Sequence, residues 1–526
     1  MSIDTQPAAP SGPVPGPPPD KLDAQVLKVA GVVVLGAIMS ILDITVVNVA
    51  LPTFQSVFAA NPAHPLAYST VAWTVTGYTL ALATVIPLSG WAADRFGTKR
   101  LYMLAIFLFT VGSALCATAG SIGMLIGFRV LQGLGGGMLM PLGMTIMTRA
   151  AGPQRMGRLM AVLGVPMLLG PIGGPILGGW LIQTASWHWI FLINVPIGAV
   201  ALVYAWFALA KDDPRPSESF DFIGMLLMSP GLALFLFGVS SIPGEGTLAA
   251  PRVWVDMLIG ALLMAAFVAW SFRPKHPLLD LRLFHNRNLT VSIITMFFFA
   301  GAFFGGLLLV PTYFQEIRGE STLDAGLLVA PQGIGAMLTM PIAGALADRL
   351  PVGRIVPFGL FGILIGMFGL TQVNAHTSYH LLIGELFVMG LGMGGTMMPL
   401  FTAALKTLRA PEVARGSTLL NITQQIASSA GVATMSVILT NHLKSSALAL
   451  PAIASQHDPS LAAKIGGAAG VAKGLAEGAA AFAHTYWVAW VLVALTLIPA
   501  FMLPIRRRQR SHLLDDEAEQ PPVVVH

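Results

Sequence analysis

The sequence has 526 residues, of which 55% are hydrophobic and only 10% are charged, and its formal net charge is +5. Soluble domains carry roughly a quarter charged residues, so this composition indicates an integral membrane protein. The basic residues occur in short clusters between apolar runs, which argues against a nucleic-acid partner. The single cysteine, Cys116, excludes a disulfide framework and a thiolate metal site.

Apolar runs of about 18–25 residues recur along most of the chain, which fits spanning helices and not the shorter alternating strands of an outer-membrane barrel. The predicted fold class is therefore all-α and polytopic. Residues 1–28 are rich in proline and predict a disordered tail, and we expect no cleaved signal peptide before the first span. Fourteen transmembrane helices are predicted, at residues 29–51, 70–91, 101–119, 122–146, 158–181, 189–209, 221–241, 254–272, 289–313, 324–346, 355–373, 380–404, 416–440 and 485–505.

The distribution of basic residues sets the orientation of these spans. If the N-terminus is cytoplasmic, 23 of the 29 Lys and Arg residues fall on the inner side. The positive-inside rule therefore predicts a multi-pass protein of the plasma (inner) membrane with both termini cytoplasmic, including the tail at 506–526. One connection is long: residues 441–484 are expected to form an outer loop, with a short amphipathic helix near Leu461 to Phe482.

Three short segments occur twice in the same order. "GWAADRFG" at Gly90 returns as "GALADRLP" at Gly344, "GLGGGMLMP" at Gly133 returns as "GLGMGGTMMP" at Gly390, and "LPTFQ" is echoed by "VPTYFQ", with offsets of 254, 257 and 259 residues. The chain thus contains two parallel six-helix repeats, at 29–209 and 274–505, with two inserted helices at 210–273. This organisation is typical of transporters that rock one half against the other.

Two charged residues lie inside predicted spans at similar depth. Asp43 lies about eight residues, roughly 12 Å, from the outer end of the first span, and Arg129 about seven residues, roughly 10 Å, from the outer end of the fourth. A charge in hydrocarbon normally faces a partner or a wet cavity, so we expect the two to pair, directly or through water. Arginine does not usefully release its proton, which leaves Asp43 as the titrating member. The alternative is a static structural ion pair.

A third intramembrane acid, Glu385, lies in the twelfth span. The repeat offset places it opposite Phe128, next to the position of Arg129. It is a candidate second proton or cation site, and the alternative is a residue at the outer start of its helix.

Motifs accompany these charges. "GWAADRFGTKR" (Gly90 to Arg100) follows the second span, "RVLQGLGGG" begins at Arg129, "GVPMLLGPIGGPILGG" runs from Gly164 to Gly179, and "WHWIFLINVPIG" begins at Trp187. In the first motif, Asp94 is placed to accept from the positive end of a neighbouring helix or from an arginine such as Arg95. The glycines and prolines of the third allow a helix to bend and pack closely against a neighbour.

Together these motifs resemble those of the major facilitator superfamily, and specifically its fourteen-helix drug:proton antiporter branch, over roughly residues 29–505. The resemblance implies that the first motif acts as a conformational latch through Gly90, Asp94, Arg95, Gly97 and Arg100. Thr98 departs from the family pattern, where a basic residue is usual. The second copy keeps Asp348 and Arg349 but has Pro351 where glycine is expected, which puts its latch role in doubt.

The same resemblance implies that the glycine-rich helix is the antiporter motif, with Gly164, Gly170, Pro171 and Gly174 as its marked positions, and that it seals the leak path; simple small-residue packing is the alternative. Polar residues on spans are candidates for the substrate cavity, each equally explained as a helix–helix contact: Asn48, Trp73, Tyr78, Gln132, Gln332, Asn421, Gln424 and Gln425.

The function predicted from these features is proton-coupled multidrug efflux of amphiphilic or cationic compounds by alternating access. A transporter of an endogenous lipid or cell-envelope component is the alternative on the same fold, and a membrane scaffold or receptor using the outer segment is a third. No nucleotide-binding loop or helical metal-ligand pair supports an enzyme, and no cofactor is expected. The expected partners are a small-molecule or lipid substrate, protons and the bilayer, and the chain is expected to act as a monomer.

Overall fold

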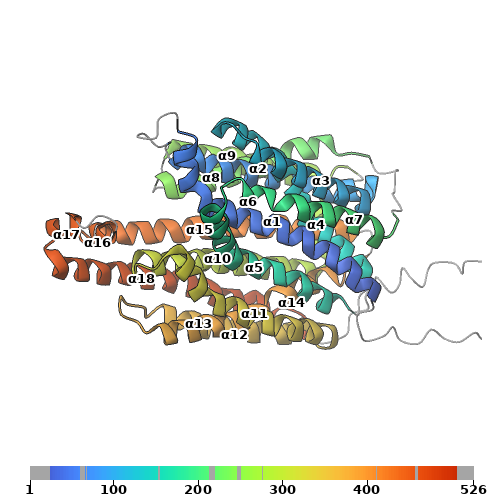
Figure 1. The fold of residues 1–526 in the computed structure, drawn as a ribbon. Helices are drawn as coiled ribbons and strands as arrows, with labels where there is room; N and C mark the ends of the chain where they lie inside the picture. Colours follow the sequence, from blue (N-terminus) through green and yellow to red (C-terminus); the bar gives the residue numbers. More distant parts are fainter. Residues whose placement is uncertain are drawn as a thin grey trace, which may run out of the picture.

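The computed structural model describes residues 24–59, 66, 68–151, 155–211, 219–245, 250–274, 277–409, 412–456 and 460–505. Within these ranges the chain forms α-helices, one short 3₁₀-helix and their connections, and no strand is present. The all-α prediction is confirmed. The long helices run side by side along one direction (Figure 1).

Each of the fourteen predicted spans coincides with a helix or a pair of consecutive helices. Among the described residues, thirteen spans are long and apolar enough to cross a bilayer, and α5, whose side chains are only partly described, is 29 residues long. The helices are α1 (Ala24–Val57), α2 (Tyr68–Phe96), α3 (Thr98–Ala117), α4 (Ile122–Ala151), α5 (Met156–Thr184), α6 (Trp189–Leu192), α7 (Asn194–Ala208), α8 (Phe222–Glu245), α9 (Pro251–Ser271), η1 (Leu281–His285), α10 (Arg287–Glu316), α11 (Thr322–Arg349), α12 (Val352–Leu370), α13 (Tyr379–Gly394), α14 (Met397–Leu405), α15 (Val413–Ser445), α16 (Ala449–Ser455), α17 (Ser460–Lys464) and α18 (Gly467–Phe501).

Two predicted spans are divided. The sixth consists of α6 and α7, and the twelfth of α13 and α14. In each case a proline, Pro196 or Pro399, follows the break within a few residues. Proline has no backbone N–H and cannot bond to the carbonyl four residues earlier, so the helical hydrogen-bond ladder is interrupted there.

The segment expected as an outer loop at 441–484 is mostly helical. Helix α15 continues to Ser445, α16 and α17 follow, and α18 runs without interruption from Gly467 to Phe501, 35 residues. The expected amphipathic helix and the last span are thus one helix, because the alanine-rich sequence between them favours helix. In Figure 1 these elements project beyond the other helices.

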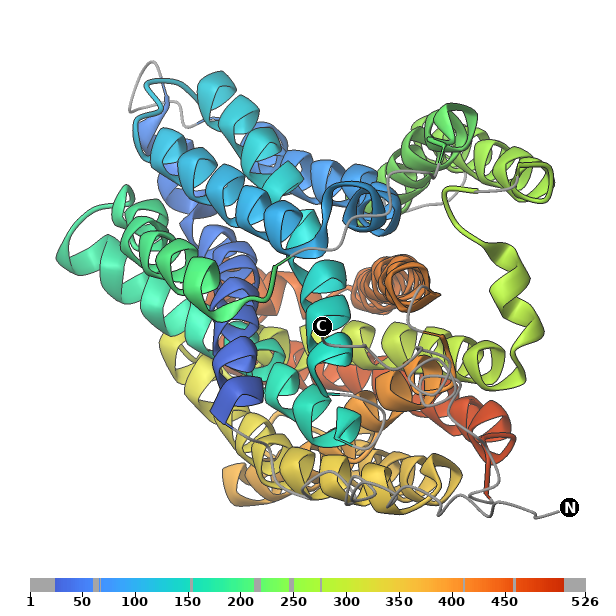
Figure 2. The ribbon, with the colours of Figure 1, turned by 90° about the vertical axis from the view of Figure 1, so that its right-hand side faces the viewer.

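The inserted helices α8 and α9 pack against each other and lie beside α2 and α15 (Figure 2). Val239 of α8 and Val253 of α9 share a small apolar cluster with Ala433 of α15. Trp73 of α2 packs on Phe237 of α8, with ring centroids 5.4 Å apart. The pair therefore contacts both repeats at one edge of the bundle.

Helix α5 packs closely on α1 through its glycines. A Cβ atom at Gly170 would lie 2.1 Å from Ile41, and one at Gly174 would lie 1.9 Å from Thr45 Oγ1. The Thr45 hydroxyl donates to the Gly170 carbonyl at 3.0 Å. These two glycines thus hold α1 in place on both sides of Asp43. Gly164 instead faces Met340 of α11, and the side chain of Pro171 lies outside the described residues.

Gly174→Ala is expected to destabilise the protein by about 1–3 kcal/mol, because its methyl group overlaps Thr45. Gly179→Ala is the matched control on the same helix: no atom outside the local helix lies within 4 Å of its added Cβ, and alanine favours helix. Thermal unfolding of both variants in the same detergent measures the difference. Equal shifts in Tm would show that the α1–α5 contact does not depend on this glycine.

Candidate functional site

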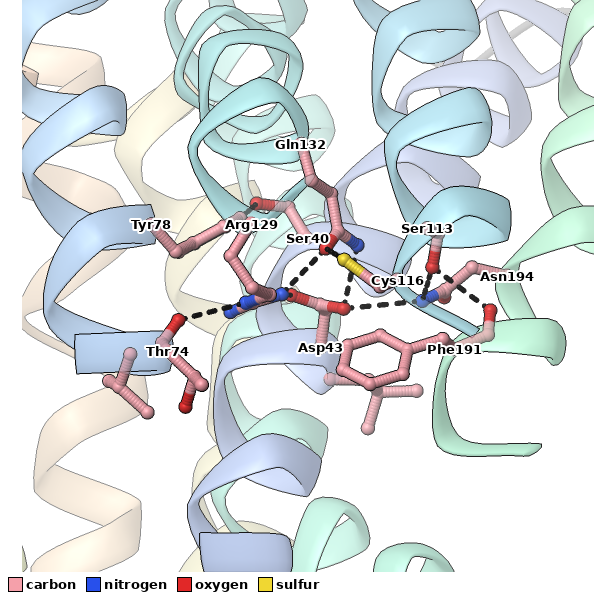
Figure 3. A network of polar contacts seen from close by, with 12 residues as sticks. Ser40, Asp43, Thr74, Tyr78, Ser113, Cys116, Arg129, Gln132, Phe191 and Asn194 are labelled. Carbon is pink, nitrogen blue, oxygen red and sulfur yellow. Dashed lines mark hydrogen bonds and ion pairs between the residues drawn. The ribbon is translucent and has the colours of Figure 1, made fainter. Parts of the chain in front are cut away.

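The structure brings Asp43 and Arg129 together. Arg129 Nη1 donates to Asp43 Oδ2 in a charge-assisted hydrogen bond between α4 and α1 (Figure 3). Both side chains are completely buried. Such a pair is costly to remove from water, and losing one partner leaves an uncompensated charge inside the protein.

Asp43 has further donors on two other side chains. Gln132 Nε2 donates to Asp43 Oδ1 at 2.8 Å, and Asn194 Nδ2 approaches the same oxygen at 3.3 Å. Both amides are buried. The carboxylate is therefore held by donors from α4 and α7, and its negative charge is spread over three hydrogen bonds (Figure 3).

Arg129 also has partners other than Asp43. Its Nη1 donates to Gln132 Oε1 at 2.7 Å, and its Nε donates to the Thr74 carbonyl of α2 at 3.0 Å. The Tyr78 ring lies 4.1 Å from the guanidinium carbon, in cation–π contact. Its Nη2 is buried and has no hydrogen-bond partner in the described part of the chain. The guanidinium thus remains held on several sides if Asp43 becomes neutral.

Several members of this network were not predicted from the sequence. Asn194 is the first residue of α7, and its Nδ2 also donates to Ser113 Oγ of α3 at 3.1 Å. Ser113 donates in turn to the Phe191 carbonyl at 2.9 Å. Cys116 Sγ lies 3.7 Å from Gln132 Oε1. The one feature of the sequence that could have indicated these contacts is Asn194, a polar residue within the apolar stretch "IFLINVPIG".

The predicted cavity residues separate into groups. Tyr78 and Gln132 belong to the buried network, whereas Asn48 is exposed and Trp73 packs against α8. In the C-terminal repeat, Asn421 donates to the Ser417 carbonyl at 2.7 Å, and Gln424 and Gln425 are half-buried on the same helix. Gln332 is buried in α11, and neither atom of its amide has a hydrogen-bond partner among the described residues.

Glu385 does not join the network. Its carboxylate packs against Gly369 of α12, where a Cβ atom would lie 1.9 Å from Oε1. Its Oε2 is buried without a hydrogen-bond partner in the described ranges. The structure therefore places Glu385 between two helices of the C-terminal repeat, away from Asp43.

In the motif that begins at Gly90, Asp94 pairs with Arg149 of α4 at 3.4 Å, and not with Arg95. Arg149 also donates to Thr98 Oγ1 at 2.8 Å. Gly97 has a φ of 93°, in the left-handed region that glycine adopts readily. Arg95 is half-buried and Arg100 is exposed beside this turn, while Gly90 lies against Thr418 and Ala414 of α15.

The second copy of this motif contacts the opposite repeat directly. Asp348 of α11 accepts from the backbone N–H of Gly157 at 2.8 Å and of Arg158 at 3.3 Å, at the N-terminus of α5. Arg158 Nε also lies 3.9 Å from this carboxylate. The positive end of a helix stabilises an anion, and through these hydrogen bonds Asp348 joins the two repeats in this structure. Arg349 is exposed next to it.

Neutral hydrogen bonds join the repeats at the same end of the bundle. The Ser89 and Thr418 hydroxyls lie 3.2 Å apart, and those of Thr145 and Ser417 lie 3.1 Å apart. Asn421 Nδ2 lies 3.5 Å from Met144 Sδ. These contacts lie where α2 and α4 end and α15 begins, which is the predicted cytoplasmic end.

The sequence model described as Major Facilitator Superfamily matches residues 33–432. The chain belongs to this superfamily. The "Multidrug resistance protein B homolog" of Mycobacterium tuberculosis is 47% identical over 509 residues, covering 94% of this chain and 92% of that protein. The "Multidrug export protein EmrB" of Escherichia coli is 29% identical over 409 residues, covering 77% of this chain and 79% of that protein.

Solved structures of the superfamily share the fold. The proton:xylose symporter XylE has a TM-score of 0.59 at 15% identity, covering 94% of this chain and 99% of that one. The human organic anion transporter MFSD10 has a TM-score of 0.58 at 15% identity, and the match covers 90% of this chain and 100% of that one. This superfamily member is a multi-pass membrane transporter and not an enzyme.

Arg129→Gln is expected to destabilise the protein by about 3–5 kcal/mol, because Asp43 then remains charged and buried without its cation. The double variant Asp43→Asn/Arg129→Gln is expected to recover most of this loss, since it removes both charges. Thermal or denaturant unfolding of the two single variants and the double variant gives the coupling energy. Simple additivity of the two single effects would contradict the proposed dependence of each charge on the other.

Asp348→Asn is expected to open the predicted cytoplasmic end more often, because it removes the charge that accepts from α5. In a Cys116→Ala background, Thr145→Cys reports opening through its rate of reaction with a thiol reagent. We expect about a tenfold faster reaction. Asp324→Asn, at the other end of α11, is the control. Equal rates in the two variants would show that Asp348 does not hold the repeats together.

Proposed function

We propose that the protein is a proton-coupled multidrug efflux antiporter that exports amphiphilic or cationic compounds by alternating access. The observation that carries the proposal is the buried Asp43–Arg129 network in a chain of this superfamily. The names of its relatives, a multidrug resistance protein homologue and a multidrug export protein, support the drug-like cargo.

Asp43 is the proposed proton carrier. Arginine stays protonated at all physiological pH values, and the tyrosine and cysteine beside it are far weaker acids than a carboxyl group. Asp43 is the one carboxylate among the network residues. Its protonation would remove the ion pair, while Arg129 keeps the Thr74 carbonyl, Gln132 and the Tyr78 ring as partners. The network therefore has two charge states without losing its framework.

The contacts between the repeats support a conformation that is closed at the cytoplasmic end, with Asp348 and the hydroxyl pairs as the closing contacts. In the proposed cycle, substrate enters from the cytoplasm and displaces the proton from Asp43. After the repeats rock outward, protonation weakens binding and the substrate leaves. Linkage requires that proton and substrate each weaken the binding of the other.

A gradient supplies the energy of this cycle. Membrane potential contributes about 2.3 kcal/mol per charge per 100 mV, and a pH gradient adds to it. The proposed location is the plasma (inner) membrane with both termini cytoplasmic, supported by the excess of basic residues in the inner connections. The proposed partners are protons, the substrate and the bilayer, with a monomer as the working unit.

Asp43→Asn in proteoliposomes is expected to abolish gradient-driven transport of a fluorescent lipophilic cation. An asparagine keeps hydrogen bonding but cannot exchange a proton. Asp256→Asn, a half-buried acid on the inserted helix α9, is the matched control and is expected to transport like the parent. The measurement is the rate of substrate movement after a pH jump. Full gradient-driven accumulation by Asp43→Asn would rule out Asp43 as the carrier.

A further inference from the structure

A cavity of about 290 Å³ lies between α1, α3, α4 and α7 at the predicted cytoplasmic end of the N-terminal repeat. Three basic side chains line it: Lys99, Arg149 and Lys211. Its described lining contains no carboxylate, and the other lining residues are apolar or neutral. The lining therefore carries three positive charges, one of which, on Arg149, is paired with Asp94 next to the cavity.

The basic side chains are held around the cavity by neighbouring groups. Lys99 Nζ donates to the Trp206 carbonyl at 2.6 Å and to the Leu209 carbonyl at 2.8 Å, at the C-terminal end of α7. Arg149 is oriented by Thr98 and by Asp94, as described above. Lys211 is exposed at the rim. Two cations are thus fixed before any ligand arrives, and a third is accessible from outside.

The backbone adds to this positive field. Helix α3 begins at Thr98, which lines the cavity, and its N-cap residue, Gly97, provides no side-chain hydrogen bond to the first turn. The N-terminus of a helix carries a partial positive charge and free N–H donors that favour anions. This helix end and the three side chains point to the same class of ligand, a phosphate-bearing anion.

The surface next to the cavity is apolar and exposed. Helix α7 presents Val200, Val203 and Trp206 with 60%, 61% and 63% exposure, and Phe107 of α3 is 51% exposed. In a spanning bundle such a surface faces acyl chains, and tryptophan is typical of the membrane interface. An anion that carries an apolar tail fits both the cavity and this surface better than a soluble anion does.

We propose that this cavity binds the phosphate headgroup of an anionic phospholipid from the cytoplasmic leaflet. Basic pockets between helices on this side of a membrane suit such headgroups. The volume lies at the lower limit for drug-sized ligands, which matches a headgroup and not a whole transported compound. The cavity is also remote from the proton site: Arg149 and Arg129 lie 20 residues apart on α4, about 30 Å.

The test uses the purified full chain and native mass spectrometry with phosphatidylglycerol or phosphatidylcholine. The parent is expected to retain phosphatidylglycerol preferentially. Lys211→Gln is expected to weaken phosphatidylglycerol binding about fivefold, since one basic residue near a lipid phosphate contributes on the order of 1 kcal/mol. Arg354→Gln is the matched control, an exposed basic residue at the same end of the C-terminal repeat, and is expected to bind like the parent.

Two results would overturn the proposal. One is equal retention of the two lipids, or an equal loss of phosphatidylglycerol binding in Lys211→Gln and Arg354→Gln. The other is a rise in Tm with inorganic phosphate that matches the rise with phosphatidylglycerol and is lost in Lys211→Gln, because the ligand would then be a soluble anion. Preferential loss in Lys211→Gln, with no effect of inorganic phosphate, supports the lipid site.

Discussion

The burial of one ion pair imposes conditions on the whole N-terminal repeat. Asp43 and Arg129 lose all contact with water, and such a loss is tolerated only when each charge has excellent geometry and its remaining hydrogen-bonding groups are largely satisfied. Side chains or carbonyls from α1, α2, α4 and α7 provide these contacts. The glycines of α5 hold α1 at the required place, and the interruption between α6 and α7 sets the position of Asn194.

The division of interactions within and between the repeats suits a rocking motion. The charged network lies wholly inside the N-terminal repeat, so the repeat can rotate as a unit without separating Asp43 from its hydrogen-bond partners. The polar contacts between the repeats include hydroxyl pairs and a carboxylate at a helix N-terminus, and α5 also packs on α11 through Gly157 and Gly344. A neutral hydrogen bond contributes only about 0.5–1.5 kcal/mol net and one to a charged group about 1.5–3 kcal/mol, so each of these polar contacts is weak enough to break and re-form.

Hydropathy and the internal repeat were sufficient to predict the all-α fold, because spanning helices must satisfy their backbone internally and are therefore long and apolar. The similar depths of Asp43 and Arg129 in the membrane could also be predicted, from the rise per residue of a helix. The hydrogen bond from Asn194 could not be predicted, since an asparagine in an apolar helix has no fixed partner until the tertiary structure provides one. The same reason explains why Arg149, and not Arg95, pairs with Asp94. A short helix was predicted near 461–482, but its continuation into the last span was missed because that segment is less apolar than a span.

Because the chain is duplicated, the positions of Asp43 and Arg129 can be compared with the equivalent positions in the C-terminal repeat. The repeat offsets place Ala302 at the position of Asp43 and Leu386 at that of Arg129, and both are completely buried. The C-terminal repeat therefore keeps the helices but has apolar side chains where the N-terminal repeat has its ion pair. Because a second buried pair would add another large desolvation cost, confining the ion pair to one repeat leaves the equivalent positions of the other free to form apolar surface. An amphiphilic substrate that binds between the repeats would then meet a rigid charged half and a more adaptable apolar half, which suits recognition of varied compounds.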